Sequence, residues 1–172
     1  LNHPDNTNWG EEGLNNTFDG LSALLERVLS GGVDDFSPTD GNLITGWDLF
    51  KNTESYDVSL LPVGRVSTVV ATYVINNIVE FRKDCICFIS PLDIDTDDVI
   101  IGSNSTNTDK IIAFRNELPS SSYAVMDSGF KYQYDKFNDK YRYVPLNGDI
   151  AGLAARTDYT NDAWWSPAGL NR

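Results

Sequence analysis

The chain has 172 residues, of which 41% are hydrophobic and 22% charged, a composition typical of a globular protein with one well-buried core. Its formal net charge of −12 opposes binding to nucleic-acid phosphates and to anionic membranes, because both need basic patches. No apolar run is long enough to span a bilayer, and no signal-peptide pattern opens the sequence. We therefore expect no nucleic-acid partner and no membrane partner. The first residue is Leu1, not Met, so we expect a piece of a longer protein or a processed chain.

The first fifty residues carry weak structural signals. Residues 1 to about 20 are polar and rich in Asn, Gly and Asp, which predicts a loop or a frayed edge. The leucine spacing over Asp19–Leu29 suits a short helix. Phe36–Trp47 contains one proline and two glycines and is predicted to be a loop with a few buried aromatic side chains, followed by a short helical turn.

The middle of the chain alternates between strand and helix patterns. Tyr56–Pro62, Cys85–Pro91 and Tyr123–Met126 are predicted strands, and the continuous apolar run of the second is typical of a sheet covered on both faces. Helices are predicted over Ser67–Lys83 and Thr106–Leu118, the latter with Thr106 or Thr108 as N-cap. The alternation predicts parallel strands joined by crossover connections.

The first of these helices is predicted from its apolar stripe. Residues at spacings of three and four share one face of a helix. The stripe consists of Val66, Val69, Val70, Tyr73, Val74, Ile78 and Phe81. Its β-branched residues lower the intrinsic helix propensity, so packing must hold the helix.

Alternating aromatic residues then predict a hairpin. They are Phe130, Tyr132, Tyr134, Tyr141 and Tyr143. Period-two alternation is typical of half-buried strands, and aromatic residues on paired strands contact each other. The polar run Asp135–Lys140 supplies the turn, and Pro145 ends the second strand. The predicted fold class is therefore α/β: a mixed sheet flanked by helices, with a C-terminal aromatic β-hairpin whose antiparallel strands make the sheet mixed.

Cys85 and Cys87 are the only cysteines in the chain, and one residue separates them. Such a short loop disfavours a disulfide between them. We expect buried free thiols in a reducing cytoplasm.

The strongest candidate for a metal site is the acidic run Asp93–Asp98. Carboxylates at alternate positions resemble the start of a calcium loop, because hard oxygen ligands can converge on one cation. However, Asp98 stands where that loop needs glycine, and Asn104 stands where it needs a bidentate Glu. We favour a solvated acidic loop and predict no bound metal. The alternative is a small α/β ligand- or metal-binding module, or an enzyme, that uses this loop at the carboxyl end of a buried strand.

Signatures of catalysis are weak elsewhere. His3 is the only histidine and lies in the polar N-terminal stretch, so a Ser-His-Asp or Cys-His arrangement would depend on it. Neither Gly31-Gly32 nor Gly148–Gly152 has the pattern of a phosphate loop or of a dinucleotide fingerprint. We predict that the chain is not an enzyme and binds no cofactor.

The C-terminal stretch combines a small-residue helix with a rigid aromatic segment. Ala and Gly in Asp149–Arg156 are spaced so that another backbone can approach the helix closely. Trp164 and Trp165 point to opposite sides if extended, and we expect one to lie in the core and the other to pack against the continuation of the chain. Pro167 keeps the residue before it out of helical geometry, and Gly169 permits a sharp change of direction.

This stretch resembles a joined motif of the tail sheath proteins of contractile-tailed bacteriophages, most closely those of the T-even type. Its first half is Val144-Pro145, Gly148-Asp149-Ile150-Ala151-Gly152 and Ala155-Arg156-Thr157-Asp158; its second half is Trp164-Trp165-Ser166-Pro167-Ala168-Gly169. Ser30-Gly31-Gly32-Val33-Asp34 extends the resemblance upstream. The candidate interface residues carried by the motif are Gly148, Asp149, Gly152, Arg156, Asp158, Trp164, Trp165, Pro167 and Gly169.

The resemblance implies a structural subunit of a virion tail. Such subunits form hexameric rings stacked helically around a tail tube, and the sheath contracts to drive the tube through the host envelope. It also implies assembly in the host cytoplasm, and an extended chain before Gly31-Gly32, in conflict with the helix suggested by the leucines. Residues 1–160 would then form one sheath domain and 161–172 a connector toward an inner domain. We expect this piece alone to be a monomer, because the polymerising contacts would lie mainly in that inner domain and in terminal arms.

Overall fold

The computed structural model describes residues 31–33, 37–102, 104–162 and 164–169, and the chain divides into two units, Leu1–Phe36 and Ser37–Arg172. In the first unit only residues 31–33 are described, and they have no regular secondary structure. The helix suggested over 19–29, and its extended alternative, lie outside the described residues. The features below all belong to the second unit.

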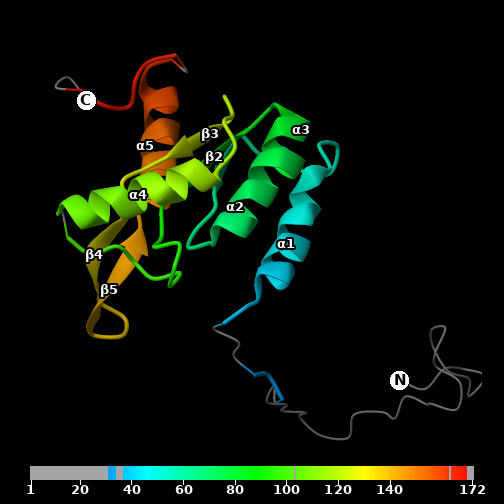
Figure 1. Cartoon of the computed structure of the whole chain (residues 1–172). Coiled ribbons are helices and arrows are strands. Elements are labelled where there is room, and N and C mark those ends of the chain that lie inside the picture. The colour runs from blue at the N-terminus through cyan, green and yellow to red at the C-terminus, as the bar shows by residue number, and fades with distance from the viewer. Residues whose placement is uncertain (1–30, 34–36, 103, 163, 170–172) are drawn as a thin grey trace, which may run out of the picture. The chain divides into compact units, whose positions relative to one another are not determined.

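The centre of this unit is a three-stranded sheet in which all the strands are parallel (Figure 1). Its strands are β1 (Leu60–Pro62), β2 (Ile86–Ile89) and β3 (Ala124–Met126), in that spatial order. The parallel order predicted from the alternation is confirmed. β1 is shorter than the predicted strand, and β3 is an edge strand with an exposed Val125, whereas the pattern had predicted a buried strand.

A long helical segment occupies the predicted span between β1 and β2. It consists of α2 (Thr68–Val74), a π-helical turn η2 (Ile75–Val79) and α3 (Glu80–Arg82). A π-helical turn contains one more residue than an α-turn, so spacings of three and four no longer mark one face beyond it.

The helical stripe is correspondingly narrower than predicted. Val70, Val74 and Ile78 are fully buried in the main hydrophobic cluster, together with Cys87 and Ile89 of β2. The predicted members Val69 and Phe81 are instead 59% and 64% exposed. Phe81 follows the π-helical turn, which explains its displacement from the stripe.

Helix α4 (Ser105–Glu117) connects β2 to β3 and crosses in front of the sheet in the view of Figure 1. Phe114, which is 1% exposed, attaches it to the main cluster. The N-cap is Asn104, whose side chain accepts a hydrogen bond from the Asn107 amide at 2.8 Å, and not one of the predicted threonines. The predicted helix was therefore right in extent to within a turn and wrong in its cap.

The loop predicted over Phe36–Trp47 is wrong, because Asp40–Asp48 forms helix α1. Thr39 caps it by accepting a hydrogen bond from the Asn42 amide. Both ends are tied to α2: Asp40 accepts from the Ser67 hydroxyl and Asp48 from the Tyr73 hydroxyl, each at 2.7 Å. These tertiary bonds outweigh the low helix propensity of the two glycines within the segment.

Helix α5 (Asn147–Thr160) covers the opposite face of the sheet. Side chains alternate across a strand, so Phe88 points away from Cys87 and Ile89, toward the face where α5 packs on β1 and β2. Phe88 and Ala151 are buried but stand outside the main cluster. α5 is six residues longer than the predicted helix, starting two residues earlier and ending four later.

The hairpin is formed by β4 (Phe130–Asp135) and β5 (Lys140–Pro145). It pairs Tyr132 with Tyr143 and Tyr134 with Tyr141, so the predicted cross-strand aromatic pairing is confirmed, as is the α/β class. In one respect the fold differs: the hairpin is a separate two-stranded sheet, and the three-stranded sheet is purely parallel. The four tyrosines are 40–61% exposed, more than the half-buried pattern predicts.

Arg82, at the end of α3, binds the segment between α1 and β1, which includes the 3-10 helical turn η1 (Leu49–Lys51). Its side chain is fully buried and donates to the carbonyl oxygens of Phe50 at 2.7 Å and Tyr56 at 2.9 Å. Its other side makes a two-point ion pair with Asp84 at 2.8 and 2.9 Å. Planar, paired donors of this kind are a property of arginine that lysine lacks.

The two cysteines are free and buried, as predicted. Burial raises the pKa of the Cys87 thiol to about 12. Cys87 therefore remains protonated at neutral pH and acts as a small apolar side chain of the core.

Candidate functional site on the C-terminal helix

The start of α5 is held at the carboxyl end of the parallel sheet by a buried polar network. The Asn147 side chain donates to the Gly64 carbonyl oxygen at 2.7 Å, and its backbone amide donates to the Ser90 hydroxyl at 3.1 Å. That hydroxyl donates in turn to Asp127 at 2.7 Å, which also accepts from the Gly129 amide at 2.8 Å. Burial raises the pKa of the Asp127 carboxyl. The network fixes where α5 begins relative to all three strands.

An ion pair joins α5 to the hairpin. Lys131 of β4 contacts Asp149 of α5 at 2.6 Å, and the two side chains are 35% and 44% exposed. Asp149 lies in the first turn of α5, where a negative charge interacts favourably with the helix dipole. The predicted interface residue Asp149 thus has a partner within the chain.

The outer side of α5 is lined with small residues. Gly148 and Gly152 lie one turn apart and are exposed, as is Ala155. A Cβ atom built on either glycine would meet no heavy atom within 4 Å. Glycine inside a helix costs about 0.5–1 kcal/mol relative to alanine. Among the described residues, nothing packs closely enough on either glycine to require the absence of a side chain. A neighbouring molecule packed against this side of α5 would require it.

The end of α5 and the segment after it enclose a hollow of about 370 Å³. Arg156, Pro167 and Gly169 of the predicted set line it, with Leu153 and Thr157. Gly169 has a φ of 144°, in the positive range that glycine adopts at no steric cost. Asp158 is exposed and is not among the residues that line the hollow. The structure therefore gathers three of the motif residues around one concave surface.

The two tryptophans contact each other. Their ring centroids are 5.5 Å apart with an interplanar angle of 57°, and their exposed fractions are 77% for Trp164 and 39% for Trp165. The expectation that one of them lies in the core is wrong. Asp162 accepts a hydrogen bond from the Trp165 amide at 2.9 Å, which folds the segment into a turn and brings the rings together.

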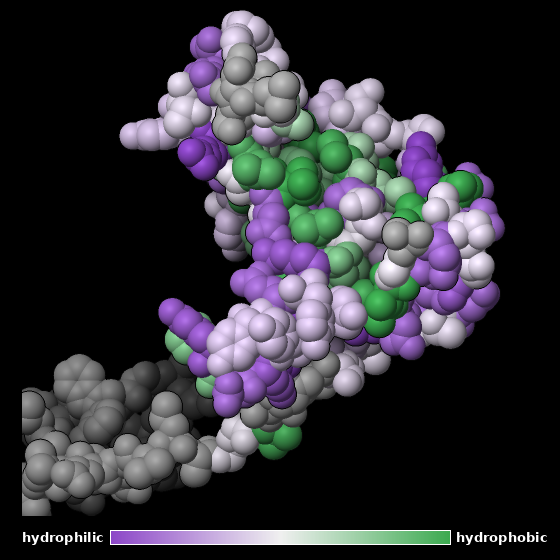
Figure 2. All heavy atoms as spheres, turned by 90° about the vertical axis from the view of Figure 1, so that its left-hand side faces the viewer, coloured by the Kyte–Doolittle hydropathy of each residue, from purple (hydrophilic) through white to green (hydrophobic). Residues whose placement is uncertain are grey.

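Large exposed side chains extend this surface along α5. Leu153 is 45% exposed and Tyr159 is 92% exposed. Seen from the left of Figure 1, hydrophobic residues gather midway up the molecule, with more hydrophilic residues above and below (Figure 2). Apolar surface next to polar rims is typical of protein–protein contacts.

The acidic loop after β2 is engaged in ion pairs. Asp93 pairs with Lys110 at 2.5 Å, and this hydrogen bond lowers the pKa of the Asp93 carboxyl. Asp98 lies 3.4 Å from Arg65. Among the residues that the structure describes, no three His, Cys, Asp or Glu side chains are arranged to hold a metal ion. His3 lies outside the described residues.

Helices that could cross a membrane are absent from the described part of the chain.

The network beneath α5 was not predicted from the sequence. Asn147 contacts residues 57 and 83 positions earlier in the chain, and no local pattern marks such partners. The available signal was limited to position: Ser90 lies near the end of the predicted strand Cys85–Pro91, Asp127 directly follows the predicted strand Tyr123–Met126, and the carboxyl ends of parallel strands meet at one edge.

These observations define the class of protein as an α/β module. Its candidate site is the exposed surface of α5 and of the segment after it, and Asp93, Asp98 and Asp149 form ion pairs with cationic side chains of the same chain. No family model matches the chain. It is 38% identical to the tail sheath protein of Enterobacteria phage T4 over 90% of the chain and 25% of that protein. It is 34% identical to the tail sheath protein of Vibrio phage KVP40 over 83% of the chain and 24% of that protein. With the tail sheath protein of Salmonella phage ViI it shares 34% identity over 98% of the chain and 25% of that protein.

The chain is therefore related to the tail sheath proteins of T4-like phages, and the resemblance of its C-terminal motif to that family is confirmed. It spans about a quarter of the length of the curated relatives it matches.

Proposed function

We propose that the chain is part of a structural, non-enzymatic subunit of a contractile phage tail sheath. In this role it lies in the virion tail, where subunits polymerise around the tail tube and contract to drive the tube through the host envelope. The observation that carries the proposal is the 38% identity to the T4 tail sheath protein, which extends over 90% of the chain.

The finer partners follow from the same role. We infer that the neighbours are other sheath subunits, arranged in stacked hexameric rings, and the tail tube. Residues 1–160 act as one sheath domain, and 161–172 as a connector toward an inner domain. Because the main polymerising contacts lie outside these residues, the chain alone is a monomer, and sedimentation velocity should return a single monomeric species.

The outer side of α5 and the segment after it are the candidate interface. Two exposed helical glycines leave room for a neighbouring backbone, and the exposed Trp164 is a large apolar side chain near the same helix. Tryptophan is frequent among the residues that dominate interface energies. This surface can therefore supply both close backbone approach and apolar contact to a neighbouring subunit.

A chimera tests the proposal. The quarter of the T4 tail sheath protein that matches this chain is replaced by the chain, and the product is examined by electron microscopy for tubes. Tubes are the expected result. A chimera that stays dispersed, while the unmodified T4 protein polymerises under the same conditions, contradicts the proposal.

A pair of variants in that chimera tests the interface. Gly152→Leu places a large side chain on the outer side of α5 and should abolish tubes. Ile112→Leu, a change of shape at an exposed position of α4, should leave them intact. If both variants form tubes, the neighbouring subunit contacts a surface other than the outer side of α5.

The alternative, a ligand- or metal-binding module at Asp93–Asp98, has less support. Two of its carboxylates already have cationic partners in Lys110 and Arg65. A rise in melting temperature on adding calcium, absent in Asp95→Asn, would revive it.

A further inference from the structure

Basic charge is concentrated in the hairpin. Residues 130–145 contain four of the thirteen Lys and Arg residues of the chain, namely Lys131, Lys136, Lys140 and Arg142. The same span contains two acidic residues, Asp135 and Asp139, so its formal charge is +2. Because the whole chain carries −12, the remainder carries −14. The hairpin is thus a positive projection on a negative protein.

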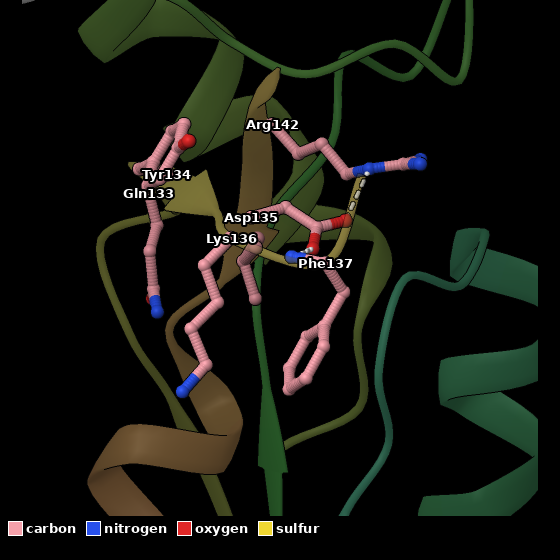
Figure 3. A pocket seen from close by; sticks show the side chains of 7 residues that line it. Gln133, Tyr134, Asp135, Lys136, Phe137 and Arg142 are labelled. Carbon is pink, nitrogen blue, oxygen red and sulfur yellow. Dashed lines mark hydrogen bonds and ion pairs between the residues drawn. The ribbon is translucent and has the colours of Figure 1, made fainter. Parts of the chain in front are cut away.

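The end of the hairpin is also hollowed. A concave surface of about 440 Å³ is lined by side chains of both strands and of the turn, including Gln133, Lys136, Phe137 and Arg142 (Figure 3). Phe137 is 88% exposed, and the Lys136 ammonium lies 5.1 Å from the centre of its ring. We call Lys136, Phe137, Lys140 and Arg142 the basic tip.

Only one nitrogen of the Arg142 guanidinium, Nε, has a partner among the described residues of the hairpin. Its Nε donates to Asp135 at 3.0 Å, and this carboxylate also accepts from the Asn138 side chain at 2.7 Å. Within the described residues, the two terminal nitrogens of Arg142 have no partner, and Figure 3 shows them lying beyond the ion pair. A guanidinium held at Nε with both terminal nitrogens available is suited to a second carboxylate, bound through two donors.

We propose that the basic tip binds carboxylate side chains on the surface of a second copy of this chain. Charge complementarity supports this occupant, because the protein outside the hairpin is strongly negative and every copy presents both surfaces. The inference rests on the proposed function in that sheath assembly brings copies side by side.

The chemistry of the tip fits a protein surface. Arginine and aromatic residues are enriched in protein–protein interfaces. The acidic remainder of the chain repels a polyanion such as DNA at long range. In the isolated chain the contact is weak and brief, since one ion-pair cluster does not overcome the repulsion between two molecules of charge −12.

Light scattering on the chain measures this contact directly. The second virial coefficient is determined at about 20 mM salt, where charges act over roughly 20 Å, and at about 0.5 M, where they are screened. The double variant Lys136→Glu/Arg142→Glu should give a clearly more repulsive coefficient at low salt and the same value as the unmodified chain at high salt.

The matched control is Lys51→Glu/Lys83→Glu, which changes net charge equally at positions outside the hairpin. It should raise the low-salt coefficient by much less. Equal coefficients for the two double variants would show that only net charge matters and would overturn the proposal. Binding of a short DNA duplex to the unmodified chain, lost in the hairpin variant, would overturn it in favour of a nucleic-acid surface.

The chimera separates this inference from the proposed function. If the unmodified chimera forms no tubes, the sheath role fails whatever the scattering shows. If it forms tubes and the Lys136→Glu/Arg142→Glu chimera forms them equally well at low salt, the sheath role stands and the basic tip is not a contact between copies.

Discussion

The sheet core and the C-terminal surface satisfy their residues in opposite ways. In the core, Arg82 has carbonyl and carboxylate partners on every side, and Asn147 connects three segments through one side chain and one amide. On the surface, the glycines of α5 face open space and the hairpin tyrosines are 40–61% exposed.

The difference indicates what each region is for. Core residues are explained by contacts inside the chain, so changing them should alter stability. Contacts inside the chain account neither for the glycine at position 152 nor for the terminal nitrogens of Arg142. Changing these residues should therefore alter association with other molecules while the fold persists. Four predictions test that division.

The largest effect is expected for Arg82→Met. The change removes a fully buried guanidinium and leaves the Phe50 and Tyr56 carbonyl oxygens without donors in a partly buried position, so stability should fall by about 3 kcal/mol. The midpoint of urea denaturation measures it. Arg65→Met is the control. The Arg65 side chain is 53% exposed, so the stability of this variant should stay within about 0.5 kcal/mol of that of the unmodified chain. Equal losses would remove the distinction between core and surface cations.

A smaller loss of stability is expected for Asn147→Ala. The Gly64 carbonyl oxygen loses its donor, which costs about 2 kcal/mol. Hydrogen exchange should show the amides of α5 exchanging faster, while those of α2 change less. Asn161→Ala, at the exposed end of the same helix, serves as the comparison and should be near neutral. Unchanged exchange in α5 would mean that apolar packing alone positions the helix.

Gly152→Ala should stabilise the isolated chain by about 0.5–1 kcal/mol, because alanine is the better helix former and its Cβ meets open space. Ala155→Gly, on the same exposed side, should destabilise by a similar amount. Thermal unfolding of both variants gives the comparison. A destabilising Gly152→Ala would reveal an internal contact of α5 and would weaken its assignment as an interface.

The smallest effect is a change in pH dependence. Burial raises the pKa of Asp127 above its unfolded value of about 3.9, so the folded chain holds that proton more tightly and stability declines as pH rises through the raised pKa. The Lys110 hydrogen bond lowers the pKa of Asp93, whose contribution is present above about pH 3.9 and is lost as pH falls through the lowered pKa.

Asn variants separate these two contributions. Relative to the unmodified chain, Asp127→Asn should gain stability as pH rises from about 3.9 through the raised pKa of Asp127. As pH falls below about 4, Asp93→Asn should lose less stability than the unmodified chain does. Urea midpoints across this pH range test both. Differences of the same sign would show that the surroundings of one carboxylate are misassigned.

Local patterns in the sequence determined most of the secondary structure. Apolar spacing located the helical segment over 68–82, alternating aromatics located the hairpin, and a continuous apolar run located β2. These features depend on which side chains share a face, and the geometry of a helix or strand alone sets that. The joined C-terminal motif by itself also indicates the sheath family, to which the T4 tail sheath protein belongs.

Tertiary structure decided what local patterns cannot contain. α1 forms despite its glycines because Ser67 and Tyr73 bond to its ends, and Asn147 finds partners far away in sequence. The tyrosines of the hairpin alternate as a half-buried strand would, yet no other strand pairs with theirs in the described structure. Burial and pairing depend on which segments meet, and long-range contacts between residues far apart in the chain determine that.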